Sequence, residues 1–293
     1  MGDIVRFKGG LGNQMFQYAF MKSLENRGRD VTASLGYYKE HPEEMQYELD
    51  KVFSNLQIKT ELNEGFLKGY RKWRLIRNDS EKIEEMKKQA ANRFFWNETL
   101  EEHGIFQGAV FDTTECVFAG YWQSYKYFEK NRKEILHDFT FGEGEEKLVT
   151  IRNKISTSDR YVAVHIRRGD YLQAEDKYGD ICTKVYYYKA IEYMKKVINR
   201  PIFVFFSDDI DWVRKEMQLE SAIYINKTMF DDYQSWYDMS LMSVCRASII
   251  ANSSFSWWGA WLKQRPDQII IGPQKWLNGS QCTDICPNSW LRM

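Results

Sequence analysis

The stretch that decides the fold is residues 161–171, which have the sequence YVAVHIRRGDY. Its first half is apolar and contains several β-branched residues, a composition typical of a buried strand. The strand pattern stops at Arg167 and Arg168, and Gly169 and Asp170 follow. In open α/β sheets, ligands bind outside the carboxyl ends of the strands. A binding site is therefore expected at this point of the chain.

The two arginines at the end of this strand favour an anionic ligand. Guanidinium groups bind phosphate or carboxylate oxygens through paired hydrogen bonds and keep their charge at any working pH. Gly169 allows a sharp turn or a close approach of the backbone to a ligand. The competing interpretation is a surface turn whose arginines face water, and the motif alone leaves both interpretations open.

Length and charge exclude some classes of function. The chain has 293 residues, enough for two domains, and equal numbers of acidic and basic residues give it no formal net charge. A nucleic-acid partner is therefore not expected.

Of the five cysteines only Cys282 and Cys286 are close in sequence, which favours free thiols in a reducing cytosol over a metal set. There is neither an apolar signal segment nor an apolar run long enough to span a bilayer, so a cytoplasmic protein is expected.

The opening of the chain predicts a βαβ unit. A strand over residues 3–8 is followed by the glycine-rich segment 9–14 (GGLGNQ), a helix over 15–26 and a strand over 31–34. Such a loop presents backbone N–H groups and a helix start to an anion, although glycines needed only for a tight turn would look the same. The segment matches neither G-x-G-x-x-G nor a Walker loop, so it does not indicate dinucleotide or ATP binding.

The region from residue 37 to residue 107 is expected to be mostly helical. Within it, residues 66–77 combine an apolar stripe with several lysines and arginines, and residues 81–93 predict a charged helix. A basic amphipathic stretch can lie on an anionic membrane surface. The favoured interpretation is that the stripe packs on the core while the charges face water.

A polar linker is expected to separate two domains. Residues 117–122 predict a strand, and residues 127–139 and 145–155 predict helices. The polar run 156–159 (STSD) follows and is interpreted as the linker. The expected domains are therefore residues 1–157 and 158–293.

The second half alternates strands and helices, which predicts a parallel sheet covered on both faces. The expected strands are residues 161–166, 201–206, 222–225, 247–251 and 268–271, and the expected helices are residues 184–198, 210–217, 232–245 and a further one around Ala260. Three of these strands end in polar pairs, which are Arg167 and Arg168, Asp208 and Asp209, and Ser253 and Ser254. All three pairs should lie along one edge of the sheet.

These strand ends offer the groups that a nucleoside diphosphate needs. The arginines supply positive charge, and the turn from Ser253 into a helix supplies N–H and hydroxyl donors with help from the helix dipole. A guanine needs a carboxylate acceptor, for which Asp208, Asp209 and Asp238 are candidates. Asp209 is equally well placed to cap a helix, and the tryptophan pair at 257–258 is expected to pack in the core rather than under a sugar.

Four segments together resemble the motifs of known fucosyltransferases. Residues 165–170 (HIRRGD) resemble the H-x-R-R-x-D motif shared by α1,2-, α1,6- and protein O-fucosyltransferases. Residues 9–19 (GGLGNQMFQYA) resemble the glycine loop of the α1,2 group, and residues 206–209 (FSDD) and 252–260 (NSSFSWWGA) resemble its remaining motifs. Because the four occur in the right order over nearly the whole chain, the sequence closely resembles a bacterial member of glycosyltransferase family 11.

This resemblance implies an α/β fold of the GT-B type, in which two Rossmann-like domains face one another across a cleft. Residues 1–157 would be the acceptor-side domain, and residues 158–293 would bind the donor, GDP-β-L-fucose. The implied reaction transfers L-fucose, with inversion, to the 2-hydroxyl of a terminal galactose on an oligosaccharide, with no cofactor and no metal. A transferase of another GDP- or UDP-sugar on the same fold is the alternative. The polar strand ends argue against a non-enzymatic sugar-binding module.

The resemblance also implies roles for individual residues. Arg167 would bind the β-phosphate of the donor. The other implied donor-binding residues are Gly12, Asn13, His165, Arg168, Asp208, Asp238, Ser253, Ser254 and Phe255. Asn13 would reach across the cleft, and Asp238 would contact guanine. The acceptor hydroxyl must lose a proton, and Asp170 is the first candidate base and His165 the second, although Asp170 could instead hold Arg168 in place.

Two further features bear on a metal ion and on a membrane contact. A D-x-D pattern at residues 209–211 is used by many nucleotide-sugar transferases to hold a metal, but a helix start accounts for both aspartates without one. Animal relatives have a membrane anchor before the glycine loop, and its absence here favours a bacterial cytoplasm. The basic residues 66–77 leave open a peripheral contact with the inner membrane.

Overall fold

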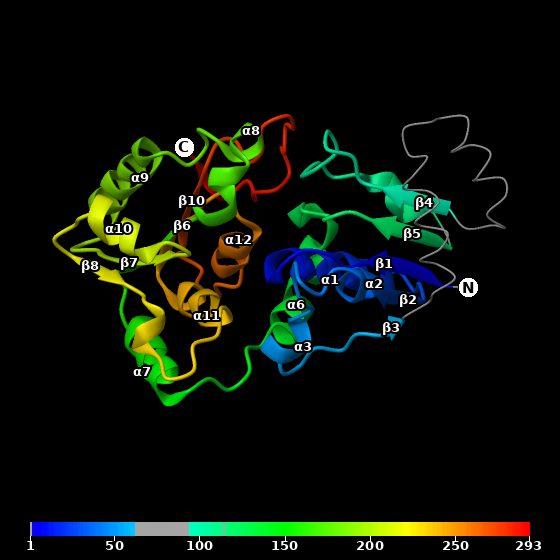
Figure 1. The fold of residues 1–293 in the computed structure, drawn as a ribbon, viewed down its shortest axis with the longest axis horizontal. Coiled ribbons are helices and arrows are strands. Elements are labelled where there is room, and N and C mark those ends of the chain that lie inside the picture. The colour runs from blue at the N-terminus through cyan, green and yellow to red at the C-terminus, as the bar shows by residue number, and fades with distance from the viewer. Residues whose placement is uncertain (1, 62–93, 114) are drawn as a thin grey trace. The chain divides into compact units, whose positions relative to one another are not determined.

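The computed structural model describes residues 2–61, 94–113 and 115–293 of the chain. The chain forms two compact units, Met1–Thr140 and Phe141–Met293. Each unit contains one parallel sheet with helices around it (Figure 1). The basic stretch 66–77 and the charged helix expected over 81–93 lie outside the described residues.

The first unit is built on a five-stranded sheet with the order β3-β2-β1-β5-β4. Its strands are β1 (Asp3–Arg6), β2 (Val31–Ser34), β3 (Thr60–Glu61), β4 (Phe94–Asn97) and β5 (Cys116–Ala119). Its described helices are α1 (Leu11–Glu25), α2 (Gly36–Glu40), α3 (Leu49–Val52) and α6 (Arg132–Asp138), with 3-10 turns at Gly108–Asp112, Tyr125–Tyr127 and Glu129–Asn131. The predicted βαβ opening is confirmed, because β1 pairs in parallel with β2.

Helix α1 begins earlier than expected. It starts at Leu11 instead of four residues later, so Gly12 and Asn13 lie in its first turn and not in a loop. Gly9 has a φ of 79°, in the left-handed region that favours glycine, and the Gln14 side chain donates to the Gly9 carbonyl oxygen over 2.9 Å. The glycine-rich segment is therefore partly a turn, fixed by a side-chain hydrogen bond, and partly the start of a helix.

Strand β4 corrects the expectation of a mostly helical region between residues 37 and 107. Its four residues, Phe-Phe-Trp-Asn, pair in parallel with β5 at one edge of the sheet. Aromatic side chains favour strands, but four residues are too few for a periodic pattern to reveal one. The described helices of this region, α2 and α3, are short.

The second unit has a six-stranded sheet with the order β11-β10-β9-β6-β7-β8. Its strands are β6 (Tyr161–Ile166), β7 (Ile202–Ser207), β8 (Ala222–Tyr224), β9 (Ala247–Ile249), β10 (Ile269–Gly272) and β11 (Leu291–Arg292). Its helices are α7 (Glu146–Ser156), α8 (Glu175–Tyr178), α9 (Lys184–Val197), α10 (Ile210–Glu216), α11 (Trp236–Val244) and α12 (Ser254–Trp261), with 3-10 turns at Gly169–Gln173 and Lys227–Met229. All strand pairs are parallel, so the predicted alternation is confirmed, and only the two-residue β11 was not expected.

Apolar side chains from the strands and helices of the second unit form its core. Val164 of β6 belongs to one buried cluster with Phe205 of β7 and with residues of α9. Trp257 and Trp258 of α12 are fully buried, so the core interpretation of this pair is confirmed. The Trp257 indole N–H donates to the Ile285 carbonyl oxygen over 2.9 Å, which satisfies its polar atom inside the core.

The two units divide between Thr140 and Phe141, earlier than the polar run at 156–159 indicated. Helix α7, which precedes that run, packs on α11 of the second unit. Phe141 also stacks on Trp236, with ring centres 5.7 Å apart. The polar run is therefore the turn between α7 and β6 inside the second unit, because polar composition marks an exposed turn and need not mark a domain boundary.

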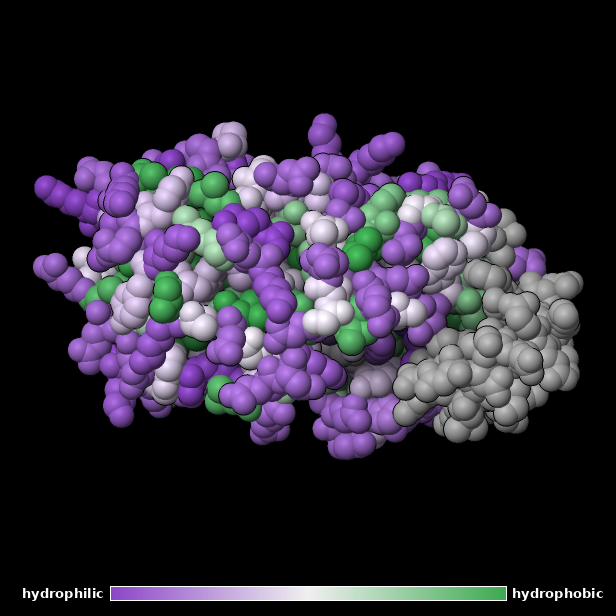
Figure 2. Space-filling model, turned by 90° about the horizontal axis from the view of Figure 1, so that it is seen from above, coloured by the Kyte–Doolittle hydropathy of each residue, from purple (hydrophilic) through white to green (hydrophobic). Residues whose placement is uncertain are grey.

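Polar side chains dominate the visible surface. Hydrophilic residues cover most of the face shown in Figure 2, and hydrophobic residues appear there in small groups. Among large apolar side chains, Leu172 and Val185 are more than half exposed. None of the described helices is long and apolar enough to cross a bilayer.

Candidate active site

Strands β9, β6 and β7 are neighbours in the second sheet, and polar residues follow each of them. Ile166 at the end of β6 is in register with Ser207 at the end of β7, and Val164 is in register with Ile249 at the end of β9. The residues after these strands therefore emerge at one edge of the sheet. This confirms the expectation that the arginine, aspartate and serine pairs share that edge.

The Arg167 guanidinium is held between two carboxylates. Its Nη1 lies 3.1 Å from Oδ2 of Asp208, and its Nη2 lies 2.8 Å from Oδ1 of Asp170. Its Nε also donates to Oδ1 of Asp170 over 3.0 Å. From the sequence, Asp170 was considered as a group that could hold Arg168. In the structure it pairs with Arg167 instead. Because 34% of the Arg167 side chain is exposed, the guanidinium is fixed in place yet still accessible to a ligand.

Arg168 makes a different set of contacts. Its Nε lies 3.1 Å from Oδ2 of Asp209, and its guanidinium carbon lies 3.6 Å from the ring centre of Trp212. Its backbone N–H donates to Oδ1 of Asp208 over 3.0 Å. Asp209 also accepts from the Trp212 N–H as the N-cap of α10, so the capping interpretation of Asp209 is confirmed. The Arg168 side chain is therefore packed on α10, and its backbone helps to hold Asp208.

Gly169 makes this arrangement possible. A Cβ atom at this position would lie 2.6 Å from Oδ2 of Asp208, so a side chain would displace the carboxylate. Two residues later, Tyr171 stacks on Tyr178 with ring centres 4.0 Å apart. The Tyr171 hydroxyl donates to the Asn252 carbonyl oxygen over 2.8 Å. The loop after β6 is thereby tied to the loop after β9.

His165 is buried within β6, with 5% of its surface exposed. Burial, and then the charge of Arg167, lower the His165 pKa to about 3, so its imidazole is neutral at physiological pH. Its Nδ1 has no hydrogen-bond partner among the described residues, and its ring centre lies 5.8 Å from that of Phe255. A buried and weakly basic imidazole is a poor acceptor for a substrate proton. Of the two predicted bases, Asp170, with 60% of its side chain exposed, is the more accessible.

Helix α12 starts directly after the loop that follows β9. Ser253 is its N-cap residue, but the Ser253 side chain makes no capping hydrogen bond. The turn is instead closed by Ser256, whose hydroxyl bonds to the carbonyl oxygens of Ala251 and Ser253. Backbone N–H groups in the first turn of a helix have no partner within the helix, and the helix dipole places partial positive charge there. The start of α12, including Ser254, can therefore donate to an anion.

Comparisons with known proteins identify the family. The sequence model of Glycosyl transferase family 11 matches residues 4–292. The chain belongs to glycosyl transferase family 11. An alpha-1,2-colitosyltransferase of Escherichia coli is 31% identical over 99% of this chain and 98% of its own length. The E. coli O-antigen biosynthesis glycosyltransferase WbnK is 28% identical over 97% of this chain and 98% of its own length. Galactoside 2-alpha-L-fucosyltransferase SEC1 of Bos taurus is 27% identical over 49% of this chain and 41% of its own length.

A solved structure supports the fold of this family 11 enzyme. The crystal structure of selenomethionine fucosyltransferase NodZ from Bradyrhizobium matches 92% of the chain and 94% of NodZ, with a TM-score of 0.50 and 12% identity. At this identity the similarity shows the fold alone. Together with the two parallel sheets, it confirms the predicted GT-B type with two Rossmann-like units.

Asp238, the predicted guanine contact of the family 11 enzyme, lies in the first turn of α11. Because α11 follows β8, its N-terminus lies on the carboxyl side of the sheet. Burial raises the Asp238 pKa to about 7, although a hydrogen bond with Tyr233 and the charge of Lys227 oppose the shift. Its Oδ1 is buried and has no hydrogen-bond partner among the described residues. A buried oxygen without a partner is costly, which favours a ligand that donates to it.

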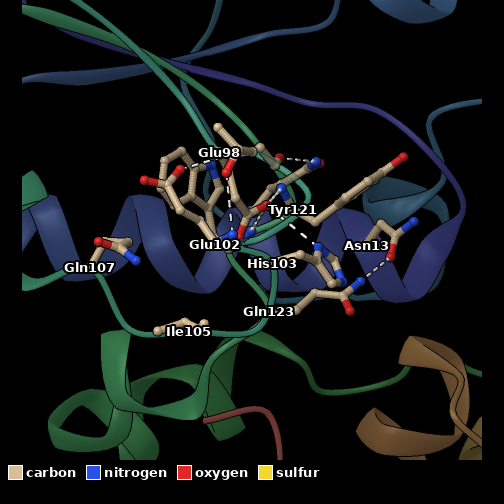
Figure 3. Close-up of polar contacts among 12 residues, drawn as sticks. Asn13, Glu98, Glu102, His103, Ile105, Gln107, Tyr121 and Gln123 are labelled. Carbon is tan, nitrogen blue, oxygen red and sulfur yellow. Dashed lines mark hydrogen bonds and ion pairs between the residues drawn. The ribbon is translucent and has the colours of Figure 1, made fainter. Parts of the chain in front are cut away.

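Gly12 and Asn13, the predicted contacts from the first unit, lie in the first turn of α1. Oδ1 of Asn13 accepts a hydrogen bond from Nε2 of Gln123 over 2.7 Å. Glu98 and His103 lie at the same end of the first sheet (Figure 3). Neither residue was singled out from the sequence, because the four-residue strand β4 that precedes Glu98 is too short to show a periodic pattern.

The residues that the structure describes offer few places for a metal ion. Three of their side chains place ligand atoms within 4.8 Å of one another, and these are His41, Glu43 and Glu44. Both glutamates are exposed, and acidic groups on a surface are common without an ion. In the D-x-D pattern, Oδ1 of Asp209 caps α10 and Oδ2 pairs with Arg168, while the Asp211 side chain is 85% exposed. A metal bound by Asp209 would have to displace contacts that the fold already uses.

Proposed function

We propose that this enzyme transfers L-fucose from GDP-β-L-fucose to the 2-hydroxyl of a terminal galactose, with inversion at the anomeric carbon. The observation that carries the proposal is Arg167, fixed at the end of β6 on the same sheet edge as the start of α12. The family, and the bovine relative that is named a galactoside 2-alpha-L-fucosyltransferase, support the sugar and the linkage.

The donor diphosphate would lie between Arg167 and the first turn of α12. The guanidinium groups of Arg167 and Arg168 pair with three carboxylates, which are those of Asp170, Asp208 and Asp209. The Asp170 side chain is the most exposed of the three, at 60%, compared with 24% for Asp208 and 43% for Asp209. A phosphate would therefore replace Asp170 most easily, while Asp208 keeps Arg167 in orientation. The start of α12 would add N–H donors and the positive end of its dipole.

The same groups would stabilise the leaving diphosphate. As the bond between the anomeric carbon and the phosphate oxygen breaks, negative charge builds on the β-phosphate. A donor that is fixed before the reaction stabilises this charge without further reorganisation, and one such donor is typically worth about 3–4 kcal/mol. Arg167, oriented by Asp208 at 3.1 Å, fits this role.

One observation favours a second donor, GDP-colitose. The E. coli relative that is 31% identical over nearly the whole chain is named an alpha-1,2-colitosyltransferase. Colitose is L-fucose without the 3-hydroxyl, so the two donors share GDP and the chemistry at the anomeric carbon. The residues described above bind the part that the two donors share, so they are compatible with either sugar.

A donor panel tests the proposal. The protein is incubated with lactose and, in separate reactions, with GDP-L-fucose, GDP-colitose, GDP-mannose or UDP-galactose. We expect a fucosylated lactose from GDP-L-fucose, with an α linkage to O2 of galactose by linkage analysis. A product from GDP-colitose alone would establish the second donor. Transfer from UDP-galactose alone, or no transfer at all, would contradict the proposal.

We further expect transfer to be independent of divalent metal. Arg167 and the start of α12 already offer positive charge to the leaving diphosphate. The Asp209 carboxylate already pairs with Arg168 and accepts the N-cap hydrogen bond of α10. Excess EDTA should therefore leave the initial rate of transfer to lactose unchanged, and Asp211→Asn should behave like the wild type. Loss of activity in EDTA, restored by Mn²⁺ or Mg²⁺, would contradict this expectation.

A further inference from the structure

Polar residues also follow strand β8, at the same edge of the second sheet. Tyr224 at the end of β8 is in register with Phe205 of β7, and the Ile225 N–H donates to the Phe205 carbonyl oxygen over 3.0 Å. Strand β8 lies two strands from β6, or about 10 Å at the ordinary strand spacing. An extended nucleotide can cover this distance, so its base can meet the residues after β8 while its diphosphate meets Arg167.

Two sets of hydrogen bonds hold the segment 226–235, which connects β8 to α11 (Figure 1). At its start, the Asn226 side chain caps a 3-10 turn by accepting a backbone N–H over 3.0 Å. Further along, Oε2 of Glu145 accepts from the N–H groups of Asp231 and Asp232, each over 3.0 Å. The backbone of this segment is therefore in place before a ligand binds, which lowers the entropy cost of binding.

Lys227 and Tyr233 stand on this segment. The Lys227 Nζ lies 5.8 Å from the ring centre of Tyr233, within the range of a cation–π contact. The Tyr233 ring centre lies 5.7 Å from that of Phe230 and 6.0 Å from that of Tyr237, and both of these side chains are buried. Tyr233 is thus anchored on the core, while Lys227 is exposed and can offer its charge to a ligand.

Both side chains act on the Asp238 carboxyl group. Burial raises the pKa of this group, whereas a hydrogen bond with Tyr233, and then the positive charge of Lys227, oppose the rise. The Asp238 Oδ1 is buried and has no hydrogen-bond partner among the described residues. A ligand placed against this oxygen would therefore meet a carboxylate acceptor with an ammonium donor close by.

A guanine has the complementary pattern of groups. Its N1–H and exocyclic amine donate, and the adjacent O6 accepts, whereas adenine carries an amine in place of O6. We propose that Lys227 donates to O6 of the guanine while Asp238 accepts from N1–H and from the amine, with Tyr233 as the positioning residue of Asp238. This inference rests on the proposed donor, GDP-fucose. Lys227 would then determine, together with Asp238, that the enzyme takes a guanine nucleotide.

Lys227→Met and the analogue 6-thio-GDP test the contact with O6. The analogue keeps N1–H and the amine but has sulfur, a weak acceptor, in place of O6. In calorimetric titrations at pH 7, the wild type should bind GDP roughly 10-fold more tightly than 6-thio-GDP, because a hydrogen bond to a charged group is typically worth about this factor. In Lys227→Met the two affinities should become nearly equal, while the preference for GDP over inosine diphosphate remains. Comparing two nucleotides on one variant cancels effects that both share, such as a change in the ionised fraction of Asp238.

Tyr233→Phe tests the positioning role. The phenylalanine ring keeps the contact with Lys227 but lacks the hydroxyl that bonds to Asp238. We therefore expect a smaller preference for GDP over inosine diphosphate and an unchanged preference for GDP over 6-thio-GDP. A tyrosine that served only the fold would, when replaced, weaken the binding of all three nucleotides equally, and that result would contradict the role.

Lys195 of α9 is a matched control, because its side chain is 44% exposed and pairs with Glu192 in the same unit. Lys195→Met should keep all three affinities. Equal binding of GDP and 6-thio-GDP by the wild type contradicts the inference. A preference for GDP over 6-thio-GDP that persists in Lys227→Met contradicts it too, because the discrimination would then come from the size of the sulfur or from another residue. A wild type that binds no GDP contradicts the proposed donor instead.

Discussion

Replacing Arg167 with alanine should weaken GDP binding and lower kcat/KM for GDP-fucose by roughly 10²–10³-fold, the typical cost of losing one donor to a developing charge. The surrounding carboxylates place the expected effect at the upper end of this range. Without the guanidinium, Asp170 and Asp208 would lose their shared partner and would repel the diphosphate. Calorimetric titration of GDP and initial-rate kinetics measure the two quantities separately.

Two further variants make this test specific. Arg167→Lys keeps the charge, but one ammonium group cannot bind phosphate through paired hydrogen bonds while it spans two carboxylates, so we expect partial recovery. Arg214 is a matched control, because its side chain is 53% exposed and lies 3.8 Å from Asp211 in the same unit. Arg214→Ala should leave both quantities unchanged. Unchanged GDP affinity in Arg167→Ala would remove Arg167 from the donor site.

The strand ends of the second unit could be predicted because buried parallel strands are continuous apolar runs. Such runs are visible in β6 and β7, and parallel topology brings whatever follows them to one edge. The pairing between these ends could not be predicted in the same way. The contacts of Asp170 with Arg167, and of Asp209 with Arg168, depend on loop conformations that Gly169 allows but does not specify.

The first unit was harder to predict because its signals are short. Strands β3 and β4 have two and four residues and lie at the edges of the sheet, where no periodic pattern can develop. The first turn of helix α1 contains Gly12 and Asn13, which are poor helix formers, but tertiary packing outweighs this preference. The Glu98 carboxylate accepts from the backbone N–H groups of Tyr121 and Trp122, and this turn includes the positive φ of Trp122, for which an aromatic residue gives no sequence signal.

Asp238 is expected to make GDP binding strongly dependent on pH. Burial raises its pKa to about 7, so the carboxyl is mostly protonated below pH 7 and ionised above it. Guanine donates from N1–H and from its exocyclic amine, and only the ionised carboxylate can accept both hydrogen bonds. The apparent affinity should follow the ionised fraction, which for a pKa near 7 gives a rise of roughly 30-fold between pH 5.5 and pH 8.

Asp238→Asn should bind GDP weakly and without this pH dependence, because an amide offers one acceptor and does not titrate in this range. Inosine diphosphate, which lacks the exocyclic amine, should bind less tightly than GDP to the wild type at pH 8, and the difference should narrow in the variant. Asp231→Asn serves as the control, since the Asp231 side chain is 77% exposed. Wild-type affinity that does not change with pH, or equal binding of the two nucleotides, would contradict the assignment.

The stability of the unliganded enzyme should fall as pH rises, whereas its affinity for GDP should rise. The pKa of Asp238 is about 7 in the folded protein against an ordinary value of 3.8, so between about pH 4 and pH 7 the folded state holds a proton that the unfolded state has lost. Stability contributed by this group therefore falls as pH rises through that window. Asparagine has no such proton, so at pH 8 the unliganded variant should unfold at a higher temperature than the wild type while binding GDP more weakly. A residue kept only for structure would lower stability when replaced. A gain in stability together with a loss of GDP affinity would therefore indicate that the buried carboxylate of Asp238 serves ligand binding and not folding.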